Sequence, residues 1–433
     1  RGRMGAGALL LAAAVGVLAA PGWARPAAAR GGLPFSNDSQ PTPRPRQAHR
    51  PHARVRHGGS SRGRPPAPGE QFSVALSQRA ADVAARGGEL TLLWPGGAPS
   101  PLFEAEMNLA VYRGEAGNVR EAHWHPDAAE WALVLQGTCF TLAVDNAGAA
   151  AADRLTAGDV WYFPRGWAHS VQAGADGCAA VLAFNSPEAV PTNDFGLSQL
   201  VAAFPAEAVA AELGETEERA LRQQAELQRI LQQGAPITFA RAPVPQAPWP
   251  STSPAVTTWP FLGRTPKECS ADGLSCIQQL FDDTFVLAKD LSAEYDTIAL
   301  GAVRTTHWHN SAAELQYVVK GRLRSTVLAY HGEPQHSMLG AGDVGWVPAG
   351  FAHTFQCLEA PCEVLLVWNA GQVPTQELDS LWRSSPLSLS AAALNATASE
   401  LAGLQPQHLF SSGGGGAQPR CSTGKESRAN LRP

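Results

Sequence analysis

Short apolar runs separated by turns occupy most of the middle of the chain. Residues 130–136 and 314–320 are rich in apolar and β-branched side chains and end at a glycine, and residues 138–144 and 323–329 partly alternate between apolar and polar positions. Alternation with a period of two is typical of half-buried strands, and glycine or proline between such runs marks turns. Many short antiparallel strands predict an all-β protein of the sandwich or jelly-roll barrel kind.

The segment between residues 206 and 234 has a different pattern. Its charged and apolar side chains follow an amphipathic helical spacing that ends at Gly234. Residues 243–260 are rich in proline and are predicted to be extended. We therefore expect a helical connector and a domain boundary near residue 240.

The same motifs occur twice, at an offset of 184 residues and with no insertion between them. The first copy contains Gly117, Arg120, His123, His125, Glu130, Gly137 and, at the end of a later Gly-Asp…Pro-x-Gly motif, His169; the second contains Gly301, Arg304, His307, His309, Glu314, Gly321 and His353. Two copies at this spacing indicate duplicated globular domains. We expect a first barrel with its C-terminal helices in residues 69–240 and a second barrel in residues 241–410.

The histidines and the glutamate of each copy form a candidate metal site. Side chains at i and i+2 of a strand share a face, so His123 and His125 offer two imidazoles to one ion while Trp124 faces away. Glu130 adds a carboxylate oxygen, and His169 comes from a later strand of the same barrel. Three neutral nitrogens and one carboxylate suit manganese or iron, whereas a structural zinc site more often uses cysteine. The second site consists of His307, His309, Glu314 and His353.

The alternative is that these are ordinary core or surface histidines, as a single His-x-His pair would suggest. Here a set of four residues occurs twice with identical spacing and uses 6 of the 12 histidines. This repetition favours two metal sites.

The two motifs, Gly-x5-His-x-His-x4-Glu-x6-Gly and Gly-x5-Pro-x-Gly-x2-His, resemble the double motif of germin-like cupins. The asparagine that often closes the second motif is replaced by Ala173 and Cys357. Two such units in one chain, with the sequences at 119–125 and 302–309, resemble the oxalate decarboxylases over roughly residues 70–405. The resemblance implies two tandem cupin barrels, two manganese ions, oxalate and dioxygen as reactants, formate and carbon dioxide as products, and a homo-oligomer.

Arg120 and Arg304 lie three residues before the first histidine of each motif, on the opposite strand face if the pleat is regular. A surface or strand-packing arginine is therefore one interpretation. The resemblance implies instead that these arginines reach the metal-bound substrate. A guanidinium makes paired hydrogen bonds to a carboxylate, so we expect both arginines to bind substrate.

The segment after the first barrel departs from the family. The resemblance implies a glutamate on a mobile lid, which acts as the general acid that supplies a proton. Aligning Phe195-Gly-Leu with the family places Pro191 at that position. In the second copy, residues 364–368 read Val-Leu-Leu-Val-Trp and lack the acid that the family often has there. We therefore expect the usual general acid to be missing.

Asp194, Glu377 and Glu188 are the candidates to replace this acid. The first two occupy corresponding places after the two barrels, in Val-Pro-Thr-Asn-Asp and Val-Pro-Thr-Gln-Glu. The alternative is helix capping, in which Thr192 and Thr375 are N-caps and the acids face the positive helix end.

Two classes of function follow. The first is an enzyme that acts on oxalate, either a decarboxylase-like carboxy-lyase or, without a proton donor, an oxidase that forms carbon dioxide and hydrogen peroxide. The second is a non-catalytic, germin-like manganese-binding protein. The repeated arginine–ligand constellation favours the enzyme, and the missing lid acid favours the second class.

The charge is distributed unevenly. Residues 1–66 hold eleven arginines and one acid, whereas the whole chain has a net charge of −5, so its body is acidic and nucleic acid is not an expected partner. The apolar run 5–20 predicts a signal peptide in residues 1–29, with a membrane anchor as the alternative. Residues 30–68 are predicted to be a basic, Arg/Pro-rich disordered leader and residues 411–433 a disordered tail. We expect a protein that is secreted to the extracellular space or cell wall and has no membrane partner once the signal is removed.

The seven cysteines fit an exported protein. Cys269 and Cys276, and likewise Cys357 and Cys362, are close enough in sequence to form small disulfide loops. Cys139 falls in a predicted strand and is expected to be a small buried apolar residue. Because seven is odd, at least one cysteine stays unpaired within the chain.

Overall fold

The computed structural model describes residues 72–95, 106–191, 193–232, 239–329, 332–404 and 408–411. The predicted signal peptide and basic leader, and the tail beyond residue 411, lie outside these residues. All described residues belong to one compact unit, residues 64–433. Within this described part, no helix is long and apolar enough to cross a membrane.

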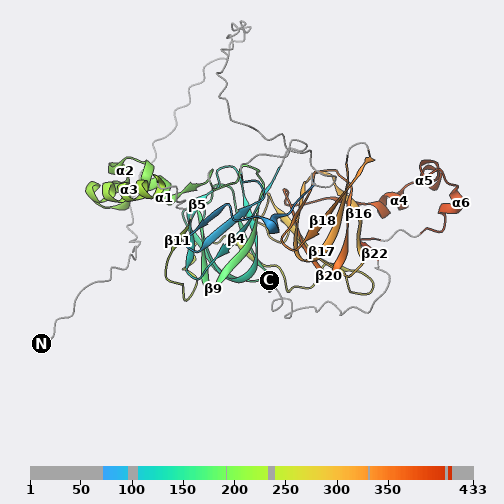
Figure 1. The fold of residues 1–433 in the computed structure, drawn as a ribbon, viewed down its shortest axis with the longest axis horizontal. Helices are drawn as coiled ribbons and strands as arrows, with labels where there is room; N and C mark the ends of the chain where they lie inside the picture. The colour runs from blue at the N-terminus through green and yellow to red at the C-terminus, as the bar shows by residue number, and fades with distance from the viewer. Residues whose placement is uncertain are drawn as a thin grey trace, which may run out of the picture. The chain divides into compact units, whose positions relative to one another are not determined.

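Two antiparallel sheets of 11 strands each make up most of the described chain, which confirms the predicted all-β fold (Figure 1). The first sheet contains β2 (Val83–Ala85), β3 (Gly88–Leu92), β4 (Asn108–Gly114), β5 (Asn118–Trp124), β6 (Glu130–Val144), β7 (Ala150–Thr156), β8 (Asp159–Phe163), β9 (His169–Phe184), β10 (Phe195–Gly196), β11 (Phe239–Arg241) and β12 (Thr258–Pro260). The second contains β1 (Ser73–Val74), β13 (Glu268–Cys269), β14 (Cys276–Leu280), β15 (Ser292–Ile298), β16 (Val303–His309), β17 (Glu314–Leu328), β18 (Pro334–Gly340), β19 (Val344–Val347), β20 (His353–Trp368), β21 (Thr375–Glu377) and β22 (Phe410–Ser411).

The repeat in the sequence is a repeat in the structure. Strands β6 and β17 begin and end at the 184-residue offset, and so do β9 and β20. These long strands pair with each other in the same way in both barrels, with Glu130 opposite Phe184 and Glu314 opposite Trp368. Each barrel therefore presents its site residues from equivalent positions.

The two barrels exchange strands across the boundary expected near residue 240. Strand β1 lies at the N-terminal end of the described chain but pairs with β19 of the second barrel, whereas β12 follows residue 240 and pairs with β8 of the first. A short 3-10 helix (Leu76–Gln78) follows β1. Apolar side chains of both barrels also share one buried cluster, in which the rings of Tyr162 and Phe285 are 6.2 Å apart.

A set of three helices follows the site strands of each barrel (Figure 1). They are α1 (Leu197–Ala203), α2 (Ala206–Leu213) and α3 (Glu217–Gln232) after β10, and α4 (Leu378–Ser384), α5 (Leu387–Ala393) and α6 (Ala398–Leu401) after β21. The helical connector predicted between residues 206 and 234 consists of two helices, α2 and α3, because Gly214 adopts a φ of 63° and ends α2 there. A left-handed residue, most readily glycine, commonly ends a helix. Gly234 lies outside the described residues.

Three disulfides connect the described cysteines. Cys269–Cys276 and Cys357–Cys362 form the two small loops that the sequence suggested. Cys139 pairs with Cys178, so its assignment as a plain apolar residue is wrong. The reason is long-range: β6 and β9 place Gly137 opposite Cys178 and so bring Cys139 close to a cysteine 39 positions away.

Candidate metal centres

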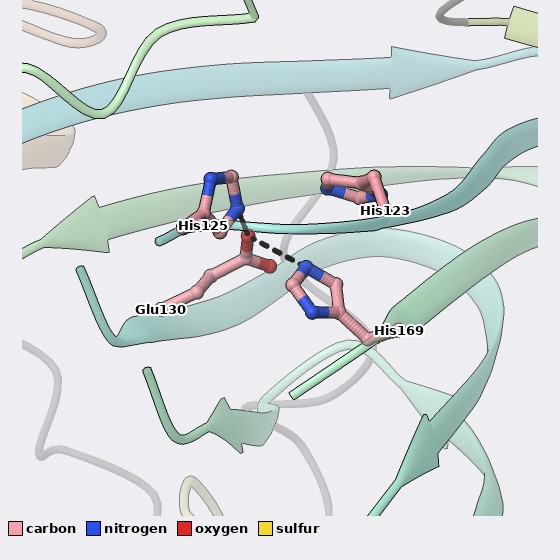
Figure 2. Close-up of side chains that lie close together, drawn as sticks. All are labelled: His123, His125, Glu130 and His169. Atoms are coloured by element: carbon pink, nitrogen blue, oxygen red, sulfur yellow. Dashed lines mark hydrogen bonds and ion pairs between the residues drawn. The ribbon is translucent and has the colours of Figure 1, made fainter. Parts of the chain in front are cut away.

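In the first barrel, four side chains from neighbouring strands meet inside the sheet. His123 lies on β5, His125 directly follows that strand, Glu130 begins β6 and His169 begins β9. The pairing of β5 with β9 sets His123 opposite His169, and one ligand atom from each of the four residues lies within 4.8 Å of the others. Figure 2 shows the three imidazole rings near the Glu130 carboxylate. The four predicted ligands therefore converge, and all are buried.

The second barrel repeats this arrangement. His307 and His309 lie on β16, and β20 brings His353 opposite His307. Together with Glu314, the first residue of β17, their ligand atoms also lie within 4.8 Å of one another.

The backbone hydrogen bonds of His123 and His169 leave the Nε2 atoms of these two rings available to a metal ion. In the first barrel, His123 Nδ1 lies 2.7 Å from the Glu121 carbonyl oxygen, and His169 Nδ1 lies 2.8 Å from that of Trp167. A carbonyl accepts a proton, so Nδ1 carries the hydrogen and Nε2 keeps its lone pair. The buried Nε2 of His169 has no hydrogen-bond partner among the described residues. A bare nitrogen buried beside a carboxylate fits a bound cation.

The histidines of the second barrel show the same hydrogen-bond pattern. His307 Nδ1 donates to the Thr305 carbonyl at 2.7 Å and His353 Nδ1 to the Phe351 carbonyl at 2.9 Å. The buried Nε2 of His353 likewise has no hydrogen-bond partner in the described part of the chain. The donor set of each barrel, three nitrogens and one carboxylate, suits a divalent transition metal such as manganese.

Tryptophan side chains orient both carboxylates. Trp161 Nε1 donates to Glu130 Oε1 at 2.7 Å, and Trp368 Nε1 donates to Glu314 Oε2 at 3.0 Å. In the second barrel, Gln316 Nε2 also donates to Glu314, at 2.7 Å. These contacts were not predicted from the sequence. The signal that could have indicated them is a tryptophan on a strand that flanks each site, because a buried tryptophan needs a partner for its N–H group.

The electrostatics of Glu130 and His123 favour the forms of these two residues that bind metal. Burial alone would raise the pKa of Glu130, but the adjacent imidazoles of His125 and His169 outweigh it and hold this pKa well below its ordinary value. Burial lowers the pKa of His123 well below its usual range, and the nearby Arg120 lowers it further. Glu130 is therefore ionised and His123 neutral, as metal coordination requires.

Arg120 and Arg304 point to the same side as the histidines. A regular pleat would put an arginine three residues before His123 on the opposite face. In both barrels, however, the strand register shifts between the arginine and the first histidine. Such a β-bulge changes the direction of a side chain, and both arginines are buried. The regular pleat assumed from the sequence is therefore wrong at this point.

Asp194 joins the arginine to a metal ligand in the first barrel. It precedes β10 and accepts hydrogen bonds from Arg120 Nη2 and, at 2.6 Å, from His125 Nδ1. Burial disfavours the charged form of His125, but the Asp194 carboxylate, together with that of Glu130, outweighs burial and raises the pKa of His125 to about 9.

The second barrel divides these contacts between two residues. Glu377 accepts a hydrogen bond from Arg304 Nη1 at 3.2 Å, whereas His309 Nδ1 lies 3.1 Å from the Thr375 hydroxyl.

Helix capping does not explain the positions of Asp194 and Glu377. The N-cap of α1 is Gly196, and Glu377 is the N-cap of α4 only through its backbone, since its side chain makes no capping hydrogen bond. Thr192 lies outside the described residues.

Comparison with known proteins places the chain in a family. The model of the cupin family matches residues 76–220 and 288–400. The chain belongs to the cupin family.

Among curated proteins, this cupin is 31% identical to oxalate decarboxylase OxdC of Bacillus subtilis over 253 residues, which are 58% of this chain and 62% of the relative. It is 26% identical to a probable oxalate decarboxylase of Arthroderma benhamiae over 297 residues, 64% of this chain and 68% of the relative. The aligned part thus spans less than two thirds of the bacterial relative. A solved structure of the Bacillus subtilis enzyme superposes with a TM-score of 0.68 at 25% identity, covering 78% of this chain and 87% of that one. The predicted resemblance to bicupins of the oxalate decarboxylase type is confirmed.

The first cupin barrel encloses a cavity of about 30 Å³ beside its metal ligands. Arg120 and Asp194 contribute polar groups, and most of the remaining wall is apolar and includes Val190 and Pro191. Glu188 is exposed and does not line this cavity; its backbone carbonyl accepts a hydrogen bond from Asn193 Nδ2. Of the two acids that sequence reasoning proposed in this segment, Asp194 alone contacts the site.

Proposed function

We propose that each barrel binds one manganese ion and that the chain is an enzyme of the oxalate decarboxylase kind. The reaction converts oxalate and one proton to formate and carbon dioxide. The observation that carries this proposal is the burial of the Arg120 guanidinium in the same small cavity as His123, His125 and Glu130. A cation next to a metal centre is suited to hold a small carboxylate substrate.

The relatives support both the metal and the substrate. The similar proteins from Bacillus subtilis and Arthroderma benhamiae are described as oxalate decarboxylases, and Mn(II) centres are described in the former. When bound, manganese supplies Lewis-acid and redox chemistry. His123, His125, Glu130 and His169 would hold it in the first barrel, and His307, His309, Glu314 and His353 in the second.

The size of the cavity restricts the substrate. One water occupies roughly 10–15 Å³ on this measure, so about 30 Å³ admits only a small ligand next to the metal ligands. The apolar wall formed by side chains such as Leu182 and Val171 offers no partner for a longer, hydroxylated acid. Oxalate, the smallest dicarboxylate, meets both restrictions.

Arg120 and Asp194 act together in this proposal. Asp194 fixes the guanidinium, and the remaining N–H groups of Arg120 can bind a substrate carboxylate. Fixing a donor before the substrate arrives lowers the cost of orienting both groups.

The residues over the site favour a second candidate reaction, in which oxalate, dioxygen and two protons from solvent give two molecules of carbon dioxide and one of hydrogen peroxide. Decarboxylation needs a proton donor, and the sequence alignment predicts that Pro191 stands in place of the lid glutamate that the resemblance implies. Pro191 lines the cavity, which supports this interpretation. Asp194 is the remaining acid at this place, and both of its oxygens accept hydrogen bonds from Arg120 and His125.

Product analysis separates these reactions. Purified, manganese-loaded protein is incubated with oxalate, and formate and hydrogen peroxide are quantified in the same sample. Formate as the main product supports the proposal, and peroxide supports the oxidase. If the fully loaded protein forms neither product, both candidate reactions are contradicted and the non-catalytic, germin-like function is favoured.

We also propose that the chain is exported and forms a homo-oligomer. Three disulfides among the described cysteines support export, because disulfides persist mainly in oxidising compartments. Exposed leucines on the helices, such as Leu213, Leu221 and Leu389, support association through these elements.

A further inference from the structure

The interiors of the two barrels differ in charge on the strand that faces the arginine. At the 184-residue offset, Ala110 and Tyr112 of β4 correspond to Glu294 and Asp296 of β15. Both residues of β4 line the first cavity together with Arg120. The equivalent positions of the second barrel therefore bring two carboxylates toward its centre, and both are buried, at 2% and 0% exposure.

These carboxylates surround Arg304. Its Nε lies 4.0 Å from Asp296 Oδ2, and its Nη1 lies 3.0 Å from Glu377 Oε1. Glu294, together with these two acids, contributes to a raised pKa of Arg304 even though burial opposes the charge. One guanidinium thus faces three acids in the second barrel, whereas Arg120 of the first pairs with Asp194.

No hydrogen bond within the described part of the chain compensates for the burial of the Asp296 carboxyl group. Neither of its oxygens, nor Arg304 Nε, has a hydrogen-bond partner among the described residues. Burial and the adjacent Glu294 raise the pKa of Asp296 well above its ordinary value. The second barrel therefore holds three buried acids near one arginine, whereas the arginine of the first barrel pairs with the single acid Asp194.

We propose that Glu294 and Asp296 are anion-selectivity residues, which weaken the binding of carboxylate substrates at the second centre relative to the first. This inference rests on the proposed function for the identity of the substrate. The electrostatic barrier that the two acids form applies to any anion. With equal metal ions and equal ligand sets in both barrels, the extra acids make the second interior more negative. One additional charge at roughly 10 Å in a protein interior changes the affinity for an anion by about tenfold.

Swapping the residues between barrels tests the barrier. In one background, Glu130→Ala removes a ligand of the first centre, so that manganese occupies the second; the converse background carries Glu314→Ala. Glu294→Ala and Asp296→Tyr are then added to the Glu130→Ala background, which gives the second barrel the residues that the first barrel has at these positions. Oxalate and acetate affinities are measured by calorimetry, and the Mn(II) electron paramagnetic resonance signal reports metal occupancy.

We expect the second centre to bind both anions at least tenfold more weakly than the first, and the double exchange to recover most of this difference. The matched control is Glu359→Gln, which removes an exposed carboxylate of β20 paired with Arg322 and should leave anion affinity unchanged. If the exchanged protein does not fold or load manganese, the near-isosteric pair Glu294→Gln and Asp296→Asn provides the same removal of charge.

Two results would overturn the inference: equal acetate affinity at the two unmodified centres, or an unchanged affinity of the second centre after either double substitution with manganese bound. Failure of the proposed function has a different signature. In that case neither centre turns over oxalate, while the acetate comparison still reports the barrier.

Discussion

The carboxylate of Asp194 lies 2.6 Å from Nδ1 of His125, so an acid from the segment between β9 and β10 supports a metal ligand of the same barrel. The same carboxylate binds Arg120. Two functional groups of the site, one for metal and one for substrate, therefore depend on one side chain. In the second barrel the corresponding contacts fall to Thr375 and Glu377.

Replacing Asp194 by asparagine should impair the first centre without unfolding the protein. Asparagine keeps the shape but removes the charge that orients both partners, and loss of such outer partners typically costs about 10- to 100-fold in metal affinity or activity. We expect a decrease of this size in oxalate turnover, measured as product formed per manganese bound. Glu188→Gln is the matched control, because the Glu188 side chain is exposed and does not line the cavity. Equal turnover in the two variants would show that Asp194 does not position the site.

Arg120→Lys should abolish most turnover and leave the manganese content unchanged. Lysine keeps the positive charge but loses the planar fork that binds a carboxylate through two hydrogen bonds. We expect at least about a 100-fold decrease in kcat/KM, since a charged hydrogen bond of roughly 3 kcal/mol is lost. Arg113→Lys on β4, an exposed arginine, should have no effect. Turnover that survives Arg120→Lys would remove this arginine from substrate binding.

The metal-free protein should lose stability between pH 6.5 and pH 9. Asp194 raises the pKa of His125 from 6.5 to about 9 against the opposing effect of burial. A group whose pKa is raised by folding stabilises the folded state fully below its unfolded pKa and loses this contribution as the pH rises through the folded value. We expect the free energy of unfolding to fall by at most about 3 kcal/mol over this range.

Urea unfolding in the presence of a chelator at the two pH values measures this effect. The Asp194→Asn variant should show a much smaller decrease, because the partner that raises the pKa has been removed. A decrease of the same size in the variant would mean that another group causes it.

The disulfide Cys139–Cys178 should stabilise the protein more than Cys357–Cys362. Their cysteines are 39 and 5 residues apart, and a longer closed loop restricts the unfolded chain more. Chain-entropy estimates give about 4 and about 2 kcal/mol. Denaturant unfolding of the two double Cys→Ser variants tests the order; a larger loss from the shorter loop would contradict it.

The sequence was sufficient for the fold and the eight candidate ligands, because both depend on local patterns. Two histidines at i and i+2 must share a strand face, and a second copy of the whole set removed the ambiguity of a single motif. The position of Arg120 could not be predicted in this way. A bulge between Arg120 and His123 reverses the expected face, and no residue there marks it as a glycine would.

Contacts between distant segments account for the other differences. Cys139 joins Cys178, and Asp194 reaches His125, only after strand register is established, and no local spacing encodes these pairs. The exchange of β1 and β12 between the barrels depends on register in the same way. Gly214, in contrast, was visible in the sequence as a helix breaker, although the amphipathic pattern on both sides of it concealed the break.

The manganese content of the purified protein tests the central claim most directly. Elemental analysis is performed on the unaltered chain and on Glu130→Ala and Glu314→Ala, each after loading with manganese and removal of unbound metal. If three histidines and one glutamate bind an ion in each barrel, the unaltered chain holds two ions and each variant holds about one. Two ions retained in both variants, or none in the unaltered chain, would contradict the account.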